Sequence, residues 1–207
     1  MRIWLALLLA SSLWSCSDTQ EFRALPPGST VLAFGDSVTH GTGAGSGEDY
    51  PSRLAELSGW QVINAGIPGD TADRARGRLG GLLSTHQPEL VIIELGGNDF
   101  LRKRRASQVQ ENLEELIKES QASGATTVLV AVPRLSMLRA SVGALEDSPI
   151  YADLAESTGV LLIDDVFSDV LSDEALRADP IHPNAEGYRV LAGGLAEQLA
   201  AAGLLNR

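Results

Sequence analysis

The sequence predicts an α/β fold, a three-layer α/β/α sandwich around a parallel, flavodoxin-like sheet of five strands. Short apolar runs without polar alternation are typical of strands that are buried on both faces of a parallel sheet. Longer amphipathic segments separate these runs, and alternation of strands and helices favours a sheet covered by helices on both sides. The expected strands are Val31–Phe34, Val62–Ile63, Leu90–Ile93, Val128–Val132 and Val160–Ile163.

Helices are expected in the segments between and after the strands. Asp49 and Asn184 are candidate N-caps, and Gly124 is expected to end the third helix. Apolar side chains at helical spacing mark the faces that pack on the core. The expected helices are Pro51–Leu57, Thr71–Leu83, Ser107–Ser123 and Asn184–Leu199, with core stripes Val109, Leu113, Leu116, Ile117 and Tyr188, Leu191, Leu195, Leu199.

The N-terminus is interpreted as a targeting segment. Residues 1–15 combine Arg2, a short apolar run and small residues, as a secretory signal peptide does. Leu13-Trp14-Ser15-Cys16 resembles the bacterial lipoprotein cleavage box, so Cys16 is a candidate lipidation site; ordinary secretion with a free Cys16 thiol is the alternative. Residues 16–28 are interpreted as a tether and residues 29–207 as one domain. Ser17 after the cysteine favours the outer membrane, on its periplasmic face.

Composition excludes several classes of function. The chain has 207 residues and a formal net charge of -11, which makes binding to nucleic acid phosphates unfavourable. A single cysteine excludes an internal disulfide framework, and three scattered histidines do not form a metal site. No phosphate-binding or dinucleotide-binding loop occurs, so no metal or cofactor is expected.

Two segments far apart in the sequence supply the parts of a nucleophilic hydrolase. Ser37 lies in Gly-Asp-Ser after the first expected strand, and His182 lies three residues after Asp179 in Asp-Pro-Ile-His-Pro. A serine attacks, a histidine takes its proton and a carboxylate orients the histidine. The flanking prolines disfavour a helix, so a stiff loop is expected to present Asp179 and His182 side by side.

Four polar clusters follow expected strands, namely Gly35–Ser37, Asn64–Asp70, Gly96–Asp99 and Asp179–His182. Because ligands bind beyond the carboxyl ends of parallel strands, these clusters are expected to converge on one edge of the sheet. The aspartates Asp36, Asp70 and Asp99 are expected to support these loops through hydrogen bonds.

The four blocks resemble those of the GDSL esterases, also called SGNH hydrolases. The stretch Val62–Asp99 is similar to the bacterial thioesterase I, arylesterase and lysophospholipase group, and the resemblance covers nearly all of the mature domain. It implies Ser37, Asp179 and His182 as the catalytic triad. It implies that backbone N–H groups of Ser37 and of a glycine in the second block, together with the Asn98 amide, form the oxyanion hole. Gly66 and Gly69 both fit, and Gly69 is favoured.

Other residues keep two interpretations. The run Arg102–Arg105 either attracts an anionic substrate or lipid headgroup to the pocket mouth or is a solvated approach to a helix. In the segment Pro133–Pro149, the side chains of Leu135, Met137 and Leu138 either line an acyl groove or pack on the domain. His40 and His86 are expected to be solvated or to pack.

The sequence therefore supports three hypotheses. The first is an extracytoplasmic serine esterase for carboxylic esters, thioesters or lysophospholipids, held on the membrane by a lipid anchor. The second is an O-acetyl esterase for cell-wall or other polysaccharides. The third, a non-catalytic flavodoxin-like binding module, is disfavoured by the complete set of Ser37, Asn98, Asp179 and His182.

Overall fold

The computed structural model describes residues 22–134 and 145–206 and contains the expected parallel sheet. Its strands stand in the order β2-β1-β3-β4-β5, which is the flavodoxin-like order, and every neighbouring pair is parallel. The prediction of fold class is confirmed. The strands are β1 (Thr30–Gly35), β2 (Gln61–Gly66), β3 (Leu90–Glu94), β4 (Thr126–Val130) and β5 (Leu161–Ile163).

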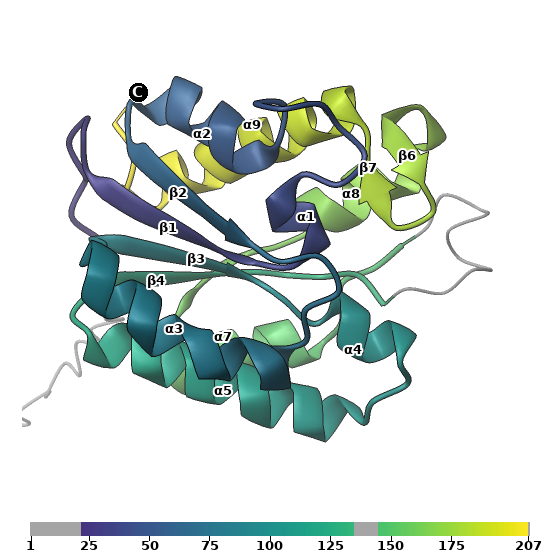
Figure 1. Ribbon diagram of the computed structural model, residues 1–207, viewed down its shortest axis with the longest axis horizontal. Coiled ribbons are helices and arrows are strands. Elements are labelled where there is room, and N and C mark those ends of the chain that lie inside the picture. The colour runs from purple at the N-terminus through teal and green to yellow at the C-terminus, as the bar shows by residue number, and fades with distance from the viewer. Residues whose placement is uncertain (1–21, 135–144, 207) are drawn as a thin grey trace, which may run out of the picture.

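Helices cover both faces of this sheet (Figure 1). One layer contains α2 (Tyr50–Ser58) and α9 (Ala185–Ala201), which pack on each other. The other contains α3 (Ala72–His86), α5 (Ala106–Ala122) and α7 (Ile150–Thr158). Three shorter helices are α1 (Ser37–His40), α4 (Gly97–Leu101) and α8 (Val166–Ser172).

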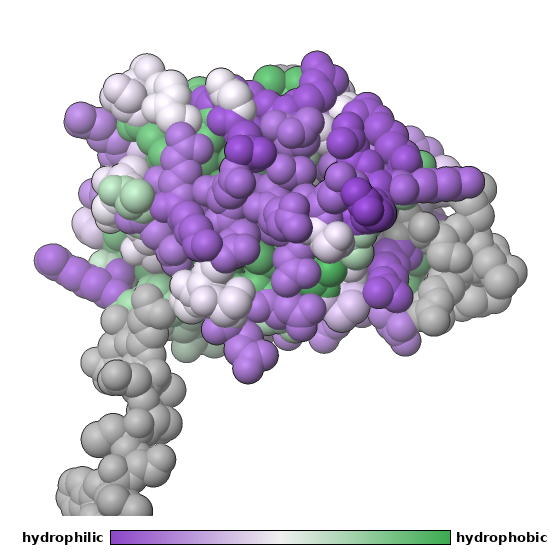
Figure 2. Space-filling view, turned by 90° about the horizontal axis from the view of Figure 1, so that it is seen from below, coloured by the Kyte–Doolittle hydropathy of each residue, from purple (hydrophilic) through white to green (hydrophobic). Residues whose placement is uncertain are grey.

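The predicted local signals of the helices are confirmed. The Asp49 carboxylate accepts a hydrogen bond from the Ser52 N–H, and the Asn184 amide oxygen accepts one from the Gly187 N–H. Gly124 follows α5 with a φ of +89°, a conformation that favours glycine. Both predicted core stripes are buried, whereas the face on which α5 lies is mostly hydrophilic, as Figure 2 shows.

Two elements differ from the sequence prediction. Asp179 and His182 lie on a short antiparallel hairpin, β6 (Arg177–Asp179) and β7 (His182–Pro183), and not on an unpaired loop. The hairpin also does not directly follow the fifth strand, because α8 and a 3-10 turn (Glu174–Leu176) intervene. Neither proline interrupts the hairpin, since Pro180 lies in its turn and Pro183 at its end.

The predicted boundary between tether and domain at residue 29 is too late. Leu25 donates its N–H to the Leu204 carbonyl over 2.9 Å, and the Trp60 indole donates to the Leu25 carbonyl over 3.4 Å. The Gly28 N–H is bonded to the Gly59 carbonyl over 2.8 Å. Hydrogen bonds therefore attach residues 22–28 to the domain. Within the described ranges, no helix is both long and apolar enough to cross a membrane.

Candidate active site

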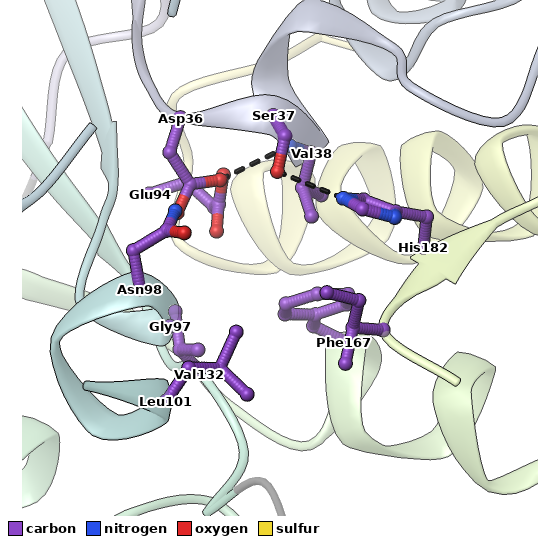
Figure 3. A pocket seen from close by; sticks show the side chains of 11 residues that line it. Asp36, Ser37, Val38, Glu94, Gly97, Asn98, Leu101, Val132, Phe167 and His182 are labelled. Carbon is purple, nitrogen blue, oxygen red and sulfur yellow. Dashed lines mark hydrogen bonds between the residues drawn. The ribbon is translucent and has the colours of Figure 1, made fainter. Parts of the chain in front are cut away.

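The polar clusters meet at the carboxyl edge of the sheet, as predicted. Figure 3 shows side chains from three of them, Ser37, Asn98 and His182, and the second cluster joins them through the hydrogen bond from the Ile67 N–H to the Gly35 carbonyl. The Ser37 Oγ lies 2.9 Å from the His182 Nε2, and the His182 Nδ1 lies 2.7 Å from the Asp179 Oδ2. The serine begins α1 directly after β1, whereas the hairpin β6–β7 presents the other two side chains. This chain of hydrogen bonds joins residues that are 145 positions apart.

The hairpin fixes the geometry of the Asp179–His182 pair. The Asp179 Oδ1 accepts hydrogen bonds from the backbone N–H groups of Ile181 and His182, each over 2.9 Å, which leaves the Oδ2 for the imidazole. Burial opposes ionisation of Asp179, but the hydrogen bond with His182 and these N–H groups lower its pKa below the usual value. Asp179 is therefore an anion across the neutral pH range.

The aspartate beside the serine caps α1 and holds the Asn98 amide. The Asp36 Oδ1 accepts the Val38 N–H over 3.0 Å, and its Oδ2 accepts the Asn98 Nδ2 over 2.9 Å. Burial raises the pKa of Asp36 to about 6, although the hydrogen bonds from Val38 and Asn98 and the charge of His182 oppose the shift. Only one of the two Asn98 amide hydrogens has an acceptor within residues 22–134 and 145–206, so the second is available to a ligand.

Sequence reasoning missed a buried polar network behind the serine. The Thr39 hydroxyl donates to the Glu94 Oε2 over 2.9 Å and contacts the Tyr50 hydroxyl at 3.0 Å. Glu94 is 1% exposed, and its pKa is well above the usual value because of burial and, secondly, the charge of Asp36. Thr39 ties α1 to β3 from a position that the sequence analysis did not assign.

The two candidate glycines of the second block have different surroundings. The Gly66 N–H donates to the Asn64 Oδ1 over 3.0 Å, and a Cβ at Gly66 would lie 2.2 Å from the His40 nitrogen. Gly66 is thus needed for close packing against α1. Gly69 has a φ of +78°, and the described residues provide no hydrogen-bond acceptor for its N–H. Gly69 is the glycine with a free donor.

The other two aspartates support the loops, as expected. The Asp70 Oδ1 accepts the Thr71 N–H over 3.1 Å, and the Asp99 Oδ2 accepts the Ala72 N–H over 2.9 Å, so both hold the start of α3. His40 is exposed, and His86 lies at the end of α3, at the opposite edge of the sheet from Ser37.

A small pocket opens beside Ser37. Its polar side carries the Asp36, Asn98 and His182 side chains, and Figure 3 shows Phe167 and Val132 across from them. The apolar lining of the pocket comes from several elements of the fold and has no common motif in the sequence. That lining consists of Val38, Leu101, Val132, Phe167 and Ile181. Leu135, Met137 and Leu138, the predicted groove residues, lie outside the described residues.

The basic run lies next to this pocket, after the pocket residue Leu101. Arg102 donates to the Gly69 carbonyl over 3.0 Å, and Arg104 lies 3.6 Å from the buried Asp99 carboxylate. Arg102 therefore joins the end of α4 to the Gly69 loop, whereas Arg104 folds back onto α4 itself. Lys103 and Arg105 are exposed.

A nucleophilic serine with a histidine and an aspartate, at the carboxyl edge of a parallel sheet, is the arrangement of a serine hydrolase. Residues 33–190 match the GDSL-like lipase/acylhydrolase family. The chain therefore belongs to this family, and it is a carboxylic ester hydrolase of the GDSL/SGNH type.

Characterised relatives cover most of both chains. The thioesterase 1/protease 1/lysophospholipase L1 of Escherichia coli K12 is 33% identical over 178 residues, which are 82% of this chain and 83% of the relative. An arylesterase of Vibrio mimicus is 34% identical over 203 residues, covering 94% and 96%. The crystal structure of the esterase EstA of Pseudoalteromonas, inhibited by monoethylphosphonate, superimposes with a TM-score of 0.71 at 29% identity, covering 83% and 97%. The similarity thus places the chain among esterases, thioesterases and arylesterases.

Proposed function

We propose that this chain is an extracytoplasmic serine esterase that cleaves carboxylic esters or thioesters through an acyl-enzyme on Ser37. The Ser37–His182–Asp179 chain of hydrogen bonds carries this proposal. The Ser37 oxygen attacks the acyl carbon while the His182 Nε2 takes its proton. The tetrahedral intermediate collapses, and His182 returns that proton to the leaving alcohol or thiol. Water, activated in the same way by His182, then releases the acid from Ser37.

The developing oxyanion is stabilised by three donors. Ser37 is the first residue of α1, so its N–H has no acceptor within the helix. The free Gly69 N–H is the second donor, and we favour it over Gly66, whose N–H is bonded to Asn64. The second amide hydrogen of Asn98 is the third, oriented by the hydrogen bond to Asp36. Removing one such donor typically lowers kcat by about 10²- to 10³-fold.

The apolar side of the pocket accepts the acyl group. Val132 and Phe167 face Ser37 across the pocket, and Leu101 borders it from α4 (Figure 3). Burial of methylene groups there contributes about 0.8 kcal/mol for each one. The acyl chain length that gives the highest kcat/KM therefore measures the depth of the apolar pocket.

A substrate panel tests the proposed reaction and its substrate class. Purified wild type and Ser37→Ala are compared on p-nitrophenyl esters from acetate to palmitate, on acyl-CoA thioesters and on a monomeric lysophospholipid. We expect hydrolysis by wild type and a loss of about 10⁴- to 10⁶-fold in folded Ser37→Ala. Equal rates for the two proteins would contradict the proposal. Activity confined to acetylated polysaccharide and acetyl esters would favour the O-acetyl esterase.

We also propose that Cys16 is lipidated and holds the enzyme at the outer membrane, facing the periplasm. The lipoprotein-type cleavage box supports this, and a relative from Bacillus subtilis that is 33% identical over 114 residues is named a lipoprotein, although it matches only 48% of this chain. Diacylation would give stable attachment.

Such an anchor restricts which substrates are reached. Phe22 lies beside Gly124–Thr127, where β4 begins, whereas Ser37 follows the carboxyl end of β1 (Figure 1). From Cys16 to Phe22 the chain spans at most about 20 Å, whereas a domain of this size is about 40 Å across. When the domain stands upright on this anchor, the active site faces away from the membrane. That orientation favours soluble or monomeric esters over lipids embedded in the same membrane.

A further inference from the structure

The guanidinium group of Arg78 joins three segments of the active-site edge. Its Nη2 donates to the Gly35 carbonyl over 2.8 Å, its Nη1 to the Ala65 carbonyl over 2.8 Å, and its Nε to the Asp70 Oδ2 over 2.9 Å. Gly35 ends β1 directly before Asp36 and Ser37. Ala65 and Asp70 lie at the two ends of the loop that contains Gly69.

Arg78 is held in one orientation by its surroundings. It projects from α3 and stacks on the Phe34 ring, with 4.0 Å from its Cζ to the ring centroid. Its side chain is 19% exposed and that of Asp70 is 5% exposed, so the ion pair is shielded from water. A planar guanidinium makes three directed hydrogen bonds and a stacking contact at once, whereas a lysine ammonium lacks this fixed geometry.

The contacts of Arg78 limit the position of the loop between Ala65 and Asp70. The Gly35 carbonyl accepts hydrogen bonds from both the Ile67 N–H, over 3.1 Å, and Arg78, so the loop and Arg78 are joined to the nucleophile turn at the same acceptor. Arg102 holds the Gly69 carbonyl from the other side. The Gly69 N–H therefore belongs to a peptide segment that is fixed at both ends.

We propose that Arg78 is a positioning residue for catalysis: it fixes the Gly69 N–H relative to the Ser37 Oγ and thereby preorganises the oxyanion hole. This inference rests on the proposed function, since it assigns Gly69 as an oxyanion donor. Stabilisation of a transition-state charge depends on donors that are already in place, so displacing one donor lowers kcat with little effect on ground-state binding.

The test compares Arg78→Lys and Arg78→Met with Arg76→Lys and Arg76→Met. Arg76 is the matched control because it lies on the same helix but is exposed and binds Asn112 and Glu115, away from Ser37. For Arg78→Lys we expect a loss of about 10- to 100-fold in kcat, with KM changed less than about threefold, and wild-type kinetics for Arg76→Lys. The affinity for a trifluoromethyl ketone, which mimics the tetrahedral intermediate, should fall by the same factor as kcat/KM.

A structural role alone predicts a different result. If Arg78 only stabilises the fold, Arg78→Lys has a lower urea midpoint, but its folded fraction keeps the wild-type kcat and the wild-type affinity for the trifluoromethyl ketone. This result would overturn the proposal. If Arg78→Met does not fold, Asp70→Asn replaces it, because this variant weakens the ion pair and should lower kcat in the same direction. A wild-type protein that hydrolyses no ester and does not react with a fluorophosphonate at Ser37 would instead refute the proposed function itself.

Discussion

Replacing Asp36 by asparagine tests how the structure balances stability against activity. The carboxylate is 3% exposed, and its pKa is raised from 3.8 to about 6. A raised carboxyl pKa contributes stability that is fully present below the unfolded value and is lost as pH rises to about 6. The shift corresponds to about 3 kcal/mol. The unfolding free energy of Asp36→Asn relative to wild type should therefore increase by up to about 3 kcal/mol between pH 4 and 7.

Activity should change in the opposite direction. Asp36 offers one oxygen to the Val38 N–H and the other to the Asn98 amide, whereas an asparagine offers a single oxygen. One of these two bonds is lost, and we expect kcat to fall by about 10- to 100-fold with KM little changed. Urea titrations at pH 4 to 8, with the exposed Asp73→Asn as control, measure the stability term. A pH-dependent difference below about 1 kcal/mol, or full activity of Asp36→Asn, would refute this reasoning.

The remaining predictions concern the base, the domain boundary and the anchor. kcat/KM should rise with pH, because a protonated His182 cannot accept the Ser37 proton; a flat profile from pH 5 to 9, with chemistry rate-limiting, would exclude His182 as the base. A chain that begins at Ser29 lacks the Leu25 contacts, so its free energy of unfolding in urea should be about 2 kcal/mol lower than that of a chain that begins at Phe22. Equal urea midpoints would show that residues 22–28 belong to the tether. Mass spectrometry of the mature N-terminus should find a diacylglyceryl group on Cys16, and an unmodified N-terminus further along the chain would remove the anchor.

The sheet and the meeting of the triad could be predicted from sequence because their signals are local. Uninterrupted apolar runs such as Leu90–Ile93 are read directly as buried strands, and parallel strands bring the segments after them to one edge. Ser37 and His182 are also predictable from local signals, because Ser37 lies in Gly-Asp-Ser directly after a strand and His182 lies between two prolines.

Side chains that act across the fold could not be predicted in this way. Arg78 resembles any arginine of an amphipathic helix, and its partners are Gly35, Ala65 and Asp70, which only the folded chain brings together. Phe167 faces the pocket from α8, a helix of 7 residues that is too short to give a clear helical pattern in the sequence.

Packing of the N-terminal segment was missed for a related reason. Pro26 and Pro27 are typical of a linker, but Leu25 pairs with the far end of the chain at Leu205. A contact between the two ends of a sequence gives no local signal.

Labelling with a fluorophosphonate tests the central claim most directly, that Ser37 is the nucleophile of an esterase. Wild type is titrated with the reagent, residual esterase activity is followed, and the modified peptide is identified by mass spectrometry. Our account predicts that one equivalent abolishes activity, that the added mass lies on Ser37 alone, and that His182→Ala is labelled far more slowly. Inactivation with the label on another residue, or an active enzyme that carries the label on Ser37, would contradict it.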